Sequence, residues 1–234
     1  MRRFYEQVSV SEVDDGFAVL LDQRELKTPA KRPLHLPSAA LASLVADEWQ
    51  AQGEEIRPHS MPHMRLTSTA VDRVTESVDA TVAEFGRYVG SDLLCYRAEG
   101  PQPLIDLQAS RWDPLLAWAQ HRYDVSFEVT AGIMHVAQSR ETQDRLMQAA
   151  TGCLFRLTGL AHATATSGSA VIALAMSAGH IDAQTAFAAA CLDDLYQQEV
   201  WGEDAEQKDR LANISLELAA MTVYFQALSS DKSS

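Results

Sequence analysis

The chain has 234 residues, 47% hydrophobic and 22% charged, as expected of a globular protein with one large or two modest domains. Its formal net charge of −13 argues against binding to nucleic acid or to an anionic membrane surface, and it favours a basic or neutral protein partner. The three cysteines (Cys95, Cys153 and Cys191) lie far apart without a CxxC pair, which suits buried thiols in a reducing compartment.

The N-terminal residues resemble neither a secretory signal nor a transit peptide. They lack an apolar run, and they carry an acid at Glu6. The longest apolar runs, Ala170 to Met176 and Ala186 to Leu192, are too short to span a bilayer. We therefore expect no membrane insertion and a cytoplasmic location in a bacterium, with a mature organelle form as the alternative.

The first third of the chain has the pattern of short strands. The alternation from Phe4 to Val10 predicts a strand with Phe4, Val8 and Val10 on one face. Asp14-Asp15-Gly16 is a strong turn signal, and a second strand is expected at Phe17 to Leu21. A short strand is expected at Glu25 to Thr28, and an extended piece at Leu34 to Leu36, which nearby prolines restrict to a sheet edge or a loop-like strand.

Helices are expected through the rest of the chain. Ser38 is a suitable N-cap for a helix through Gln52, and from about Arg65 the sequence is mostly helical. Asp113-Pro114 predicts a helix start, with the aspartate as N-cap and the proline at the first helical position. Later helices are expected at Arg140 to Leu160, after Ser167-Gly168-Ser169, and after Asp182.

These patterns predict an α+β fold in two domains. A small β-rich domain with one helix is expected over residues 1–62, and a larger all-α helical domain over residues 63–229. Residues 230–234 are rich in serine and are expected to form a disordered tail.

The last helix carries an apolar seam with 3-4-3-4-3 spacing, made of Leu211, Ile214, Leu218, Met221, Phe225 and Leu228. The seam covers only two to three heptads. It therefore favours a helix packed inside a bundle of a monomer, and a protein that dimerises through this seam remains the alternative.

An acidic run surrounds a single Trp-Gly pair, Trp201-Gly202. Between Cys191 and Arg210 there are seven acids and two bases. Tryptophan is enriched among the residues that dominate protein interfaces, and glycine permits an unusual backbone conformation. Trp201 could therefore contact a partner, or it could anchor a helix in the core while the acids face water.

A search for chemistry finds no catalytic, metal-binding or cofactor-binding motif. His59 and His63 are four residues apart, but Pro62 lies between them, and there is no GxSxG, GxGxxG or GxxxxGK[ST] sequence. Cys95 has an apolar context that suits a packed thiol better than a nucleophile. A small hydrolase or isomerase that uses Asp or Glu with His63 or His135 remains an alternative, which would require a deep pocket of converging groups.

Several segments, in order along nearly the whole chain, resemble a family of ATP synthase assembly chaperones that act on the alpha subunit of the catalytic head. Two stretches carry most of the resemblance, Ser91 to Ala98 and Tyr196 to Glu206. The supporting segments are Arg3 to Tyr5, Leu21 to Pro29, Ala46 to Gln50, Pro62 to Thr67 and Trp112 to Leu116.

The resemblance implies a non-enzymatic chaperone, without cofactor, that binds the free alpha subunit, prevents its aggregation and hands it to the beta subunit. Eukaryotic members of the family work in the mitochondrial matrix. Where other members have a glutamate in the helix before Trp-Gly, this chain has Asp194. Carried over by position, the residues implied to bind the partner are Asp194, Glu199, Trp201, Gly202, Glu203, Asp204 and Glu206.

Overall fold

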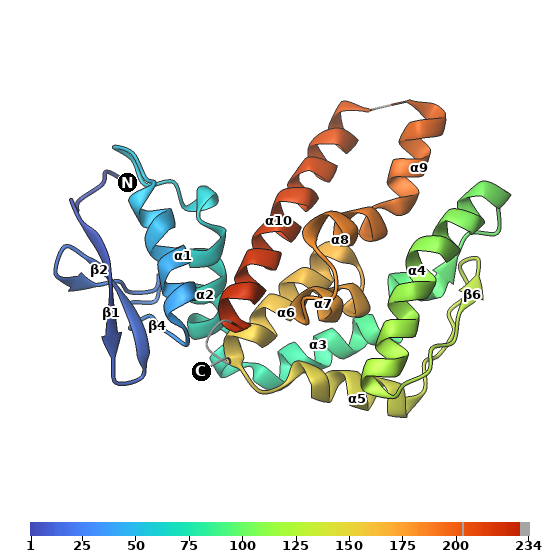
Figure 1. Ribbon diagram of the computed structural model, residues 1–234, viewed down its shortest axis with the longest axis horizontal. Helices are drawn as coiled ribbons and strands as arrows, with labels where there is room; N and C mark the ends of the chain where they lie inside the picture. The colour runs from blue at the N-terminus through green and yellow to red at the C-terminus, as the bar shows by residue number, and fades with distance from the viewer. Residues whose placement is uncertain (203, 230–234) are drawn as a thin grey trace. The chain divides into compact units, whose positions relative to one another are not determined.

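The computed structural model describes residues 1–202 and 204–229, and it divides into two compact units (Figure 1). The N-terminal unit comprises Met1–Val78, Cys153–Gly159 and the described part of Val223–Ser234. The helical unit comprises Asp79–Gly152 and Leu160–Thr222. The α+β fold expected from the sequence is confirmed, whereas the domain boundary after residue 62 stays a prediction. The expected tail at residues 230–234 lies outside the described residues.

The N-terminal unit contains a small antiparallel sheet. Its strands are β1 (Val8–Val13), β2 (Gly16–Leu21), β3 (Arg24–Glu25) and β4 (His35–Leu36). A two-residue turn joins β1 to β2, as predicted, with Val8 opposite Leu21. Both β3 and β4 pair with the other edge of β2, and one face of the sheet packs on helix α1 (Ala39–Gln50) (Figure 1).

Ser38 begins α1 as predicted. Its hydroxyl oxygen accepts a hydrogen bond from the backbone N–H of Leu41 at 3.1 Å, the geometry of an N-cap. The same hydroxyl donates to the carbonyl oxygen of Ala227 at 2.7 Å, so the cap also ties α1 to the end of the last helix. Leu41, Val45 and Trp49 are buried along this helix, and each contributes roughly 1.5–3 kcal/mol of burial free energy.

The predicted strand from Phe4 to Val10 is wrong in its first half. The backbone N–H groups of Glu6 and Gln7 donate to the carboxylate of Asp22, at 2.9 and 3.0 Å, so the chain bends before β1 begins at Val8. Phe4 is therefore exposed and does not share a face with the strand. The buried aromatic residue of this segment is Tyr5, whose hydroxyl donates to the carbonyl oxygen of Trp49 at 2.6 Å.

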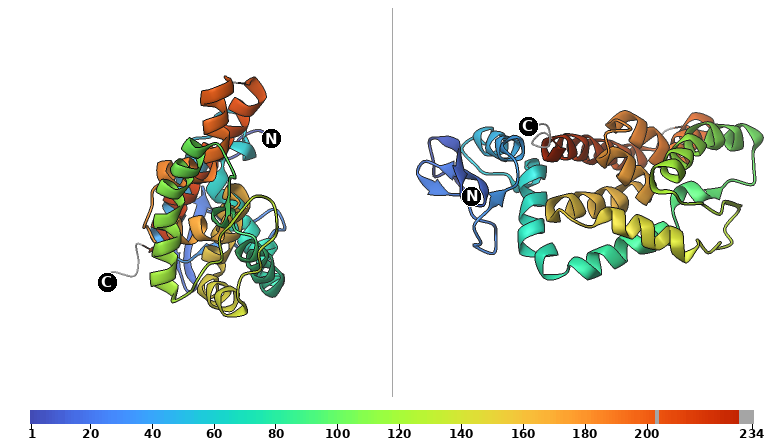
Figure 2. Two further views of the ribbon diagram at one scale, coloured as in Figure 1. Left: turned by 90° about the vertical axis from the view of Figure 1, so that its right-hand side faces the viewer. Right: turned by 60° about the horizontal axis from the view of Figure 1, so that its bottom comes forward.

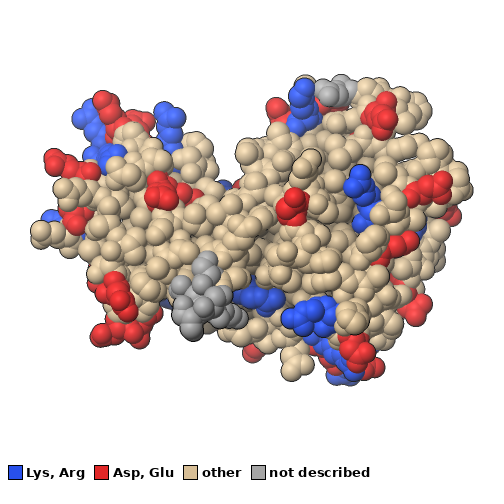
Figure 3. Space-filling model, in the orientation of Figure 1, with Lys and Arg blue, Asp and Glu red and all other residues tan. Residues whose placement is uncertain are grey.

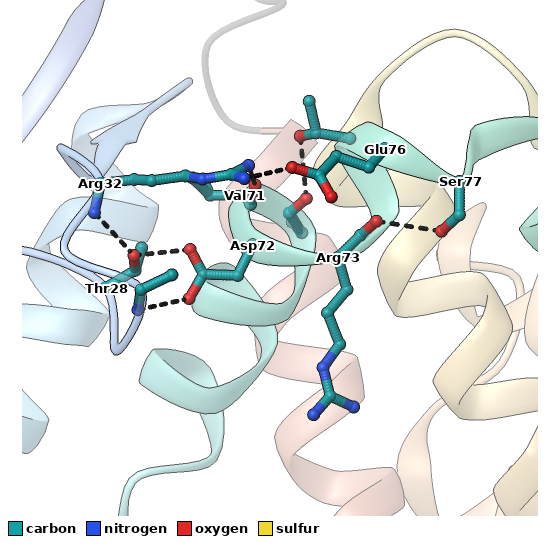
Figure 4. Close-up of polar contacts among 10 residues, drawn as sticks. Thr28, Arg32, Val71, Asp72, Arg73, Glu76 and Ser77 are labelled. Atoms are coloured by element: carbon teal, nitrogen blue, oxygen red, sulfur yellow. Dashed lines mark hydrogen bonds and ion pairs between the residues drawn. The ribbon is translucent and has the colours of Figure 1, made fainter.

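A polar network secures the loop between β3 and β4 (Figure 4). The carboxylate of Asp72, at the end of helix α2 (Pro62–Asp72), accepts hydrogen bonds from the Thr28 hydroxyl at 2.6 Å and from the Ala30 backbone at 3.1 Å. Arg32 donates to the carbonyl oxygen of Val71 at 3.0 Å and pairs with Glu76. Two short 3₁₀ helices, η1 (Pro58–Ser60) and η2 (Val74–Glu76), flank α2.

Helices α6 (Leu154–Ser167) and α10 (Ala205–Ser229) cross closely at Gly159. A Cβ atom at Gly159 would lie 2.8 Å from the Phe225 ring and 2.9 Å from the Tyr224 ring. Both rings are buried, and the Tyr224 hydroxyl donates to the carbonyl oxygen of Phe155 at 3.0 Å. Because these ring atoms are held in place, only glycine fits the crossing.

Gly159→Ala is therefore expected to lower the free energy of unfolding by roughly 1–2 kcal/mol, since overpacking outweighs the helix propensity gained. Gly86→Ala is the matched control. Its Cβ would meet the sulfur of the flexible Met147 thioether, and that side chain can move aside. Chemical denaturation of both variants checks this prediction, and equal losses would contradict it.

The helical unit surrounds the buried helix α7 (Ala170–Ser177), which Ser169 caps through a 3.0 Å bond from Ile172 N–H, as the Ser167-Gly168-Ser169 signal predicts. Two short strands, β5 (Tyr96–Arg97) and β6 (Thr130–Ala131), pair in parallel. The other elements are α3 (Val78–Gly90), η3 (Leu93–Cys95), α4 (Gln102–Tyr123), α5 (Arg140–Ala150), α8 (Ala183–Ala190) and α9 (Leu192–Trp201).

Two helix boundaries differ from the prediction. Asp113 is not an N-cap, because α4 begins at Gln102 and continues through Pro114. The N–H that Pro114 lacks would bond to the carbonyl of Ser110, and Ser110 is exposed, so water can replace the bond. The single helix predicted from Arg140 to Leu160 is two helices, separated at Gly152, which has a φ of +113°.

The predicted seam of α10 is used inside the chain. Leu211, Leu218, Met221 and Phe225 are buried inside the chain, as expected of a helix packed in a bundle, while Ile214 and Leu228 are partly exposed. Dimerisation through the seam stays an alternative that the oligomeric state in solution would decide. Among the described residues, α10 is long and apolar enough by length and composition to cross a membrane. A core helix of a globular protein meets the same criterion, and four residues of the α10 seam are buried inside the chain.

Candidate partner-binding site

The acidic run lies where α9 ends and α10 begins, at the end of an antiparallel helical hairpin (Figure 1). Gly202 stops α9 with a φ of +92° and a ψ of 167°, and its N–H donates to the carbonyl oxygen of Gln198 at 2.9 Å. That conformation is open to glycine and strained for other residues. We use the name hairpin tip for residues 199–202 and 204–206.

Trp201 projects into solvent at the hairpin tip. Its exposed fraction is 83%, and that of the neighbouring Val200 is 52%. The interpretation of Trp201 as a core anchor is therefore wrong. Two adjacent large apolar side chains on the surface, in a segment that also carries the exposed Glu199 and Glu206, have the composition of a protein-binding surface.

Asp194 lies along α9, away from the hairpin tip, and it joins the two helices. Its carboxylate pairs with the Arg210 guanidinium at 2.7 Å and accepts a hydrogen bond from the Gln207 amide at 3.3 Å. The Asp194 carboxylate raises the pKa of Arg210 above its ordinary value. Asp194 thus has an internal role in holding the hairpin together, in contrast to the exposed acids.

Gln108 anchors the start of α9, and sequence reasoning missed it. This buried side chain donates to the carboxylate of Asp193 at 2.8 Å and accepts from the backbone N–H of Ala98 at 2.8 Å. It therefore links α9 to α4 and to the Ser91 to Ala98 segment. No local signal distinguishes this glutamine from an exposed one, because its partners come from distant parts of the chain.

Two of the acids also stabilise α10. The Asp204 carboxylate accepts from the backbone N–H of Gln207 at 3.1 Å, as an N-cap does, and Glu206 lies in the first turn. Glu203 is outside the described residues. In Figure 3 the end of the hairpin carries both red acidic and blue basic side chains, so its surface is mixed in charge.

The groups considered for catalysis have structural contacts. The Glu48 carboxylate accepts hydrogen bonds from the backbone N–H groups of His63 and Met64, both at 2.8 Å, and so caps α2. The Nδ1 atom of the His63 ring lies 2.8 Å from the same carboxylate. His135 lies 3.0 Å from the Tyr96 hydroxyl. Within residues 1–202 and 204–229, no group of three or more potential metal ligands comes together.

Cys95 is a packed thiol. It is completely buried, and burial, together with the nearby Asp92, raises the pKa of its thiol to about 12. The thiolate form that a nucleophile needs is therefore scarce at neutral pH.

Asp92 is a buried carboxylate in the same segment, and it too was missed from sequence. Its Oδ1 atom accepts from the Ser169 hydroxyl at 2.7 Å and from the Leu94 N–H at 3.1 Å. Its Oδ2 atom accepts from the Val171 N–H at 3.1 Å. One side chain thus ties the start of η3 to the start of α7.

Comparisons with known proteins point to one class of protein, the assembly chaperones. The model of the ATP12 chaperone protein family matches residues 2–120. The crystal structure of Atp12 from Paracoccus denitrificans has 37% sequence identity and a TM-score of 0.92, with 97% of each chain covered. A mutant of that protein gives the same values. A chaperone candidate from Agrobacterium tumefaciens has 38% identity and a TM-score of 0.91, covering 97% of this chain and 86% of the other.

The chain belongs to the ATP12 chaperone family. The resemblance seen in the sequence is thereby confirmed, together with a chaperone role that fits ATP synthase assembly. The family and fold are those of an assembly chaperone and not of an enzyme, which leaves the hydrolase or isomerase alternative without support from these matches. The family model ends at residue 120, so the hairpin is matched by the structures alone.

Proposed function

We propose that this protein binds the unassembled alpha subunit of the ATP synthase catalytic sector, prevents its aggregation and releases it to the beta subunit. It acts as a monomer in the cytoplasm, without a cofactor or a chemical step. Family membership supports the chaperone role, and the observation that carries the binding proposal is the exposed Trp201 beside Val200 at the hairpin tip.

The physical logic of the proposal is competition for one surface. A free subunit exposes an interface that is partly apolar and would otherwise drive aggregation. The hairpin tip offers apolar contact through Val200 and Trp201, and the surrounding acids steer encounter with a basic rim. The beta subunit then displaces the chaperone because it covers the same interface more extensively.

Dilution of denatured alpha subunit into buffer, followed by light scattering, tests the function. With an equimolar amount of this protein we expect scattering to be suppressed, and adding the beta subunit should then release the chaperone. An inert acidic protein at the same concentration controls for charge and crowding. Scattering that is unchanged by the chaperone would refute the proposal.

Charge reversal at the hairpin tip tests its contribution to encounter. Glu199→Lys with Glu206→Lys should lower the association rate for the alpha subunit about tenfold at low salt, with a smaller difference at high salt. Stopped-flow fluorescence measures these rates.

The control for this experiment is Glu6→Lys with Glu12→Lys, two exposed acids of the N-terminal unit. Each exchange adds two charges, so both double variants move the net charge from −13 to −9. Equal slowing by the two pairs would show that net charge alone acts and that the hairpin tip is only a solvated helix end.

A further inference from the structure

A second exposed apolar site lies in the helical unit, in the loop that joins α4 to α5. Ile133 is 98% exposed and Met134 is 76% exposed, and Val129 on the same loop is 46% exposed. Figure 2 shows this loop in yellow-green, curving out between the end of α4 and the start of α5. We use the name loop tip for Ile133 and Met134.

The loop tip is displayed by an ordered chain. The Gln138 amide donates to the Glu128 carbonyl oxygen at 2.8 Å and accepts from the Glu128 N–H at 3.0 Å, which closes the base of the loop. Nearer the tip, β6 pairs with β5, and the Gly132 N–H donates to the carbonyl oxygen of Arg97 at 2.9 Å. A loop already ordered in this way loses little conformational entropy when it binds.

The fold itself gains almost nothing from these two side chains. An isoleucine that is 98% exposed contributes no appreciable burial to folding, so a polar residue would serve the isolated protein equally well. An unbranched methionine beside it adapts readily to the shape of an apolar surface, as it does on other binding surfaces. The loop tip thus has the properties of a contact surface.

The loop tip repeats the chemistry of the hairpin tip. The Glu99 carboxyl group lies beside Gly132, since a Cβ built on that glycine would be 3.1 Å from it, and Glu128 is exposed on the same loop. In both places two large apolar side chains stand next to carboxylates. The complementary surface is an apolar patch beside Lys or Arg, the kind of partner that the net charge of −13 also favours.

We propose that the loop tip is a second contact for the same client, the unassembled ATP synthase alpha subunit. This inference rests on the proposed function. Ile133 and Met134 dock on an apolar patch of the subunit while Val200 and Trp201 occupy another. Two linked contacts of modest strength hold the client more tightly than either alone, and each can be released in turn when the beta subunit arrives.

The test compares Ile133→Ser with Met134→Ser, made together, against Leu216→Ser as a matched control. Leu216 is 68% exposed on α10, so it has a similar apolar exposure outside the loop. Calorimetric titration with purified alpha subunit should give about tenfold weaker binding for the loop variant and less than a twofold change for the control. The melting temperatures of all three proteins should agree.

Each other outcome overturns the inference in a recognisable way. If the wild type binds the alpha subunit and the loop variant binds equally well, the second contact is wrong and the proposed function stands. If the wild type does not bind, both fail together. Sedimentation decides a third case. If the wild type is a dimer, the loop variant is a monomer and client binding is unchanged, then the loop tip binds a second copy of this chain and not the client.

Discussion

Replacing Trp201 by alanine is expected to weaken binding to the alpha subunit about 30-fold, equivalent to roughly 2 kcal/mol. The indole is 83% exposed at the hairpin tip, so its full apolar surface is available to a partner. Tryptophan combines a large rigid surface with one N–H donor, and it loses little rotamer freedom on binding. Val200 helps to exclude water from the contact, and the exposed acids steer the encounter with the partner. Truncating any one of these side chains should weaken binding less than Trp201→Ala does.

Calorimetric titration of the alpha subunit with wild type, Trp201→Ala and Trp201→Phe measures this effect. The phenylalanine variant keeps an aromatic ring and should retain most of the affinity. All three proteins should unfold at the same temperature, because an exposed side chain contributes little to folding. If Trp201→Ala binds the alpha subunit as tightly as the wild type, Trp201 is not a binding hot spot, and the loop tip becomes the main candidate for the apolar contact.

The helix caps could be predicted because their signals are local. Ser38, Ser169 and Asp182 each accept a hydrogen bond from a backbone N–H three residues ahead, so the interaction is encoded within one turn of chain. The α10 seam is similar, since its period lies within one helix and its burial follows from that period. Both features needed no knowledge of distant residues.

The errors arose where local signals compete with tertiary contacts. Asp113-Pro114 has the sequence of a helix start, yet Asp113 pairs with Arg97 at 2.7 Å, and buried residues on both sides of Pro114, such as Trp112 and Leu116, keep the helix continuous. The exposure of Trp201 could not be predicted either. A tryptophan in an acidic run fits equally a core anchor or a binding residue, and only the packing of the rest of the chain decides between them.

Asp92→Asn is expected to lower the free energy of unfolding by roughly 1–3 kcal/mol at pH 7. The Ser169 hydroxyl donates to one oxygen of Asp92, and the Val171 N–H donates to the other. Asparagine keeps only one acceptor oxygen, because an NH₂ group takes the place of the second, so the side chain cannot accept both hydrogen bonds. A buried backbone donor at the start of α7 is then left without a partner. The loss should exceed that of any single exposed hydrogen bond in the helical unit.

The pH dependence of this loss identifies Asp92 as its source. Burial raises the pKa of Asp92 to about 6, against the opposing effect of its hydrogen bonds, whereas an unfolded aspartate has a pKa of about 3.9. Between these values the folded protein binds a proton that the unfolded chain does not. The stability from this group is therefore fully present below about pH 4 and is lost as the pH rises through about 6, a change of roughly 2–3 kcal/mol.

Denaturation from pH 4 to pH 7 should accordingly show a wild-type advantage over Asp92→Asn that is larger at pH 4 than at pH 7. Asp182→Asn provides a control of opposite sign in the same unit. Hydrogen bonds from Thr185 lower the pKa of the exposed Asp182, so its contribution is present above the unfolded pKa and is lost as the pH falls. The prediction fails if the difference in unfolding free energy between wild type and Asp92→Asn is constant or grows with pH. Burial would then not disfavour the charged form of Asp92, and the side chain would act as an ordinary helix cap.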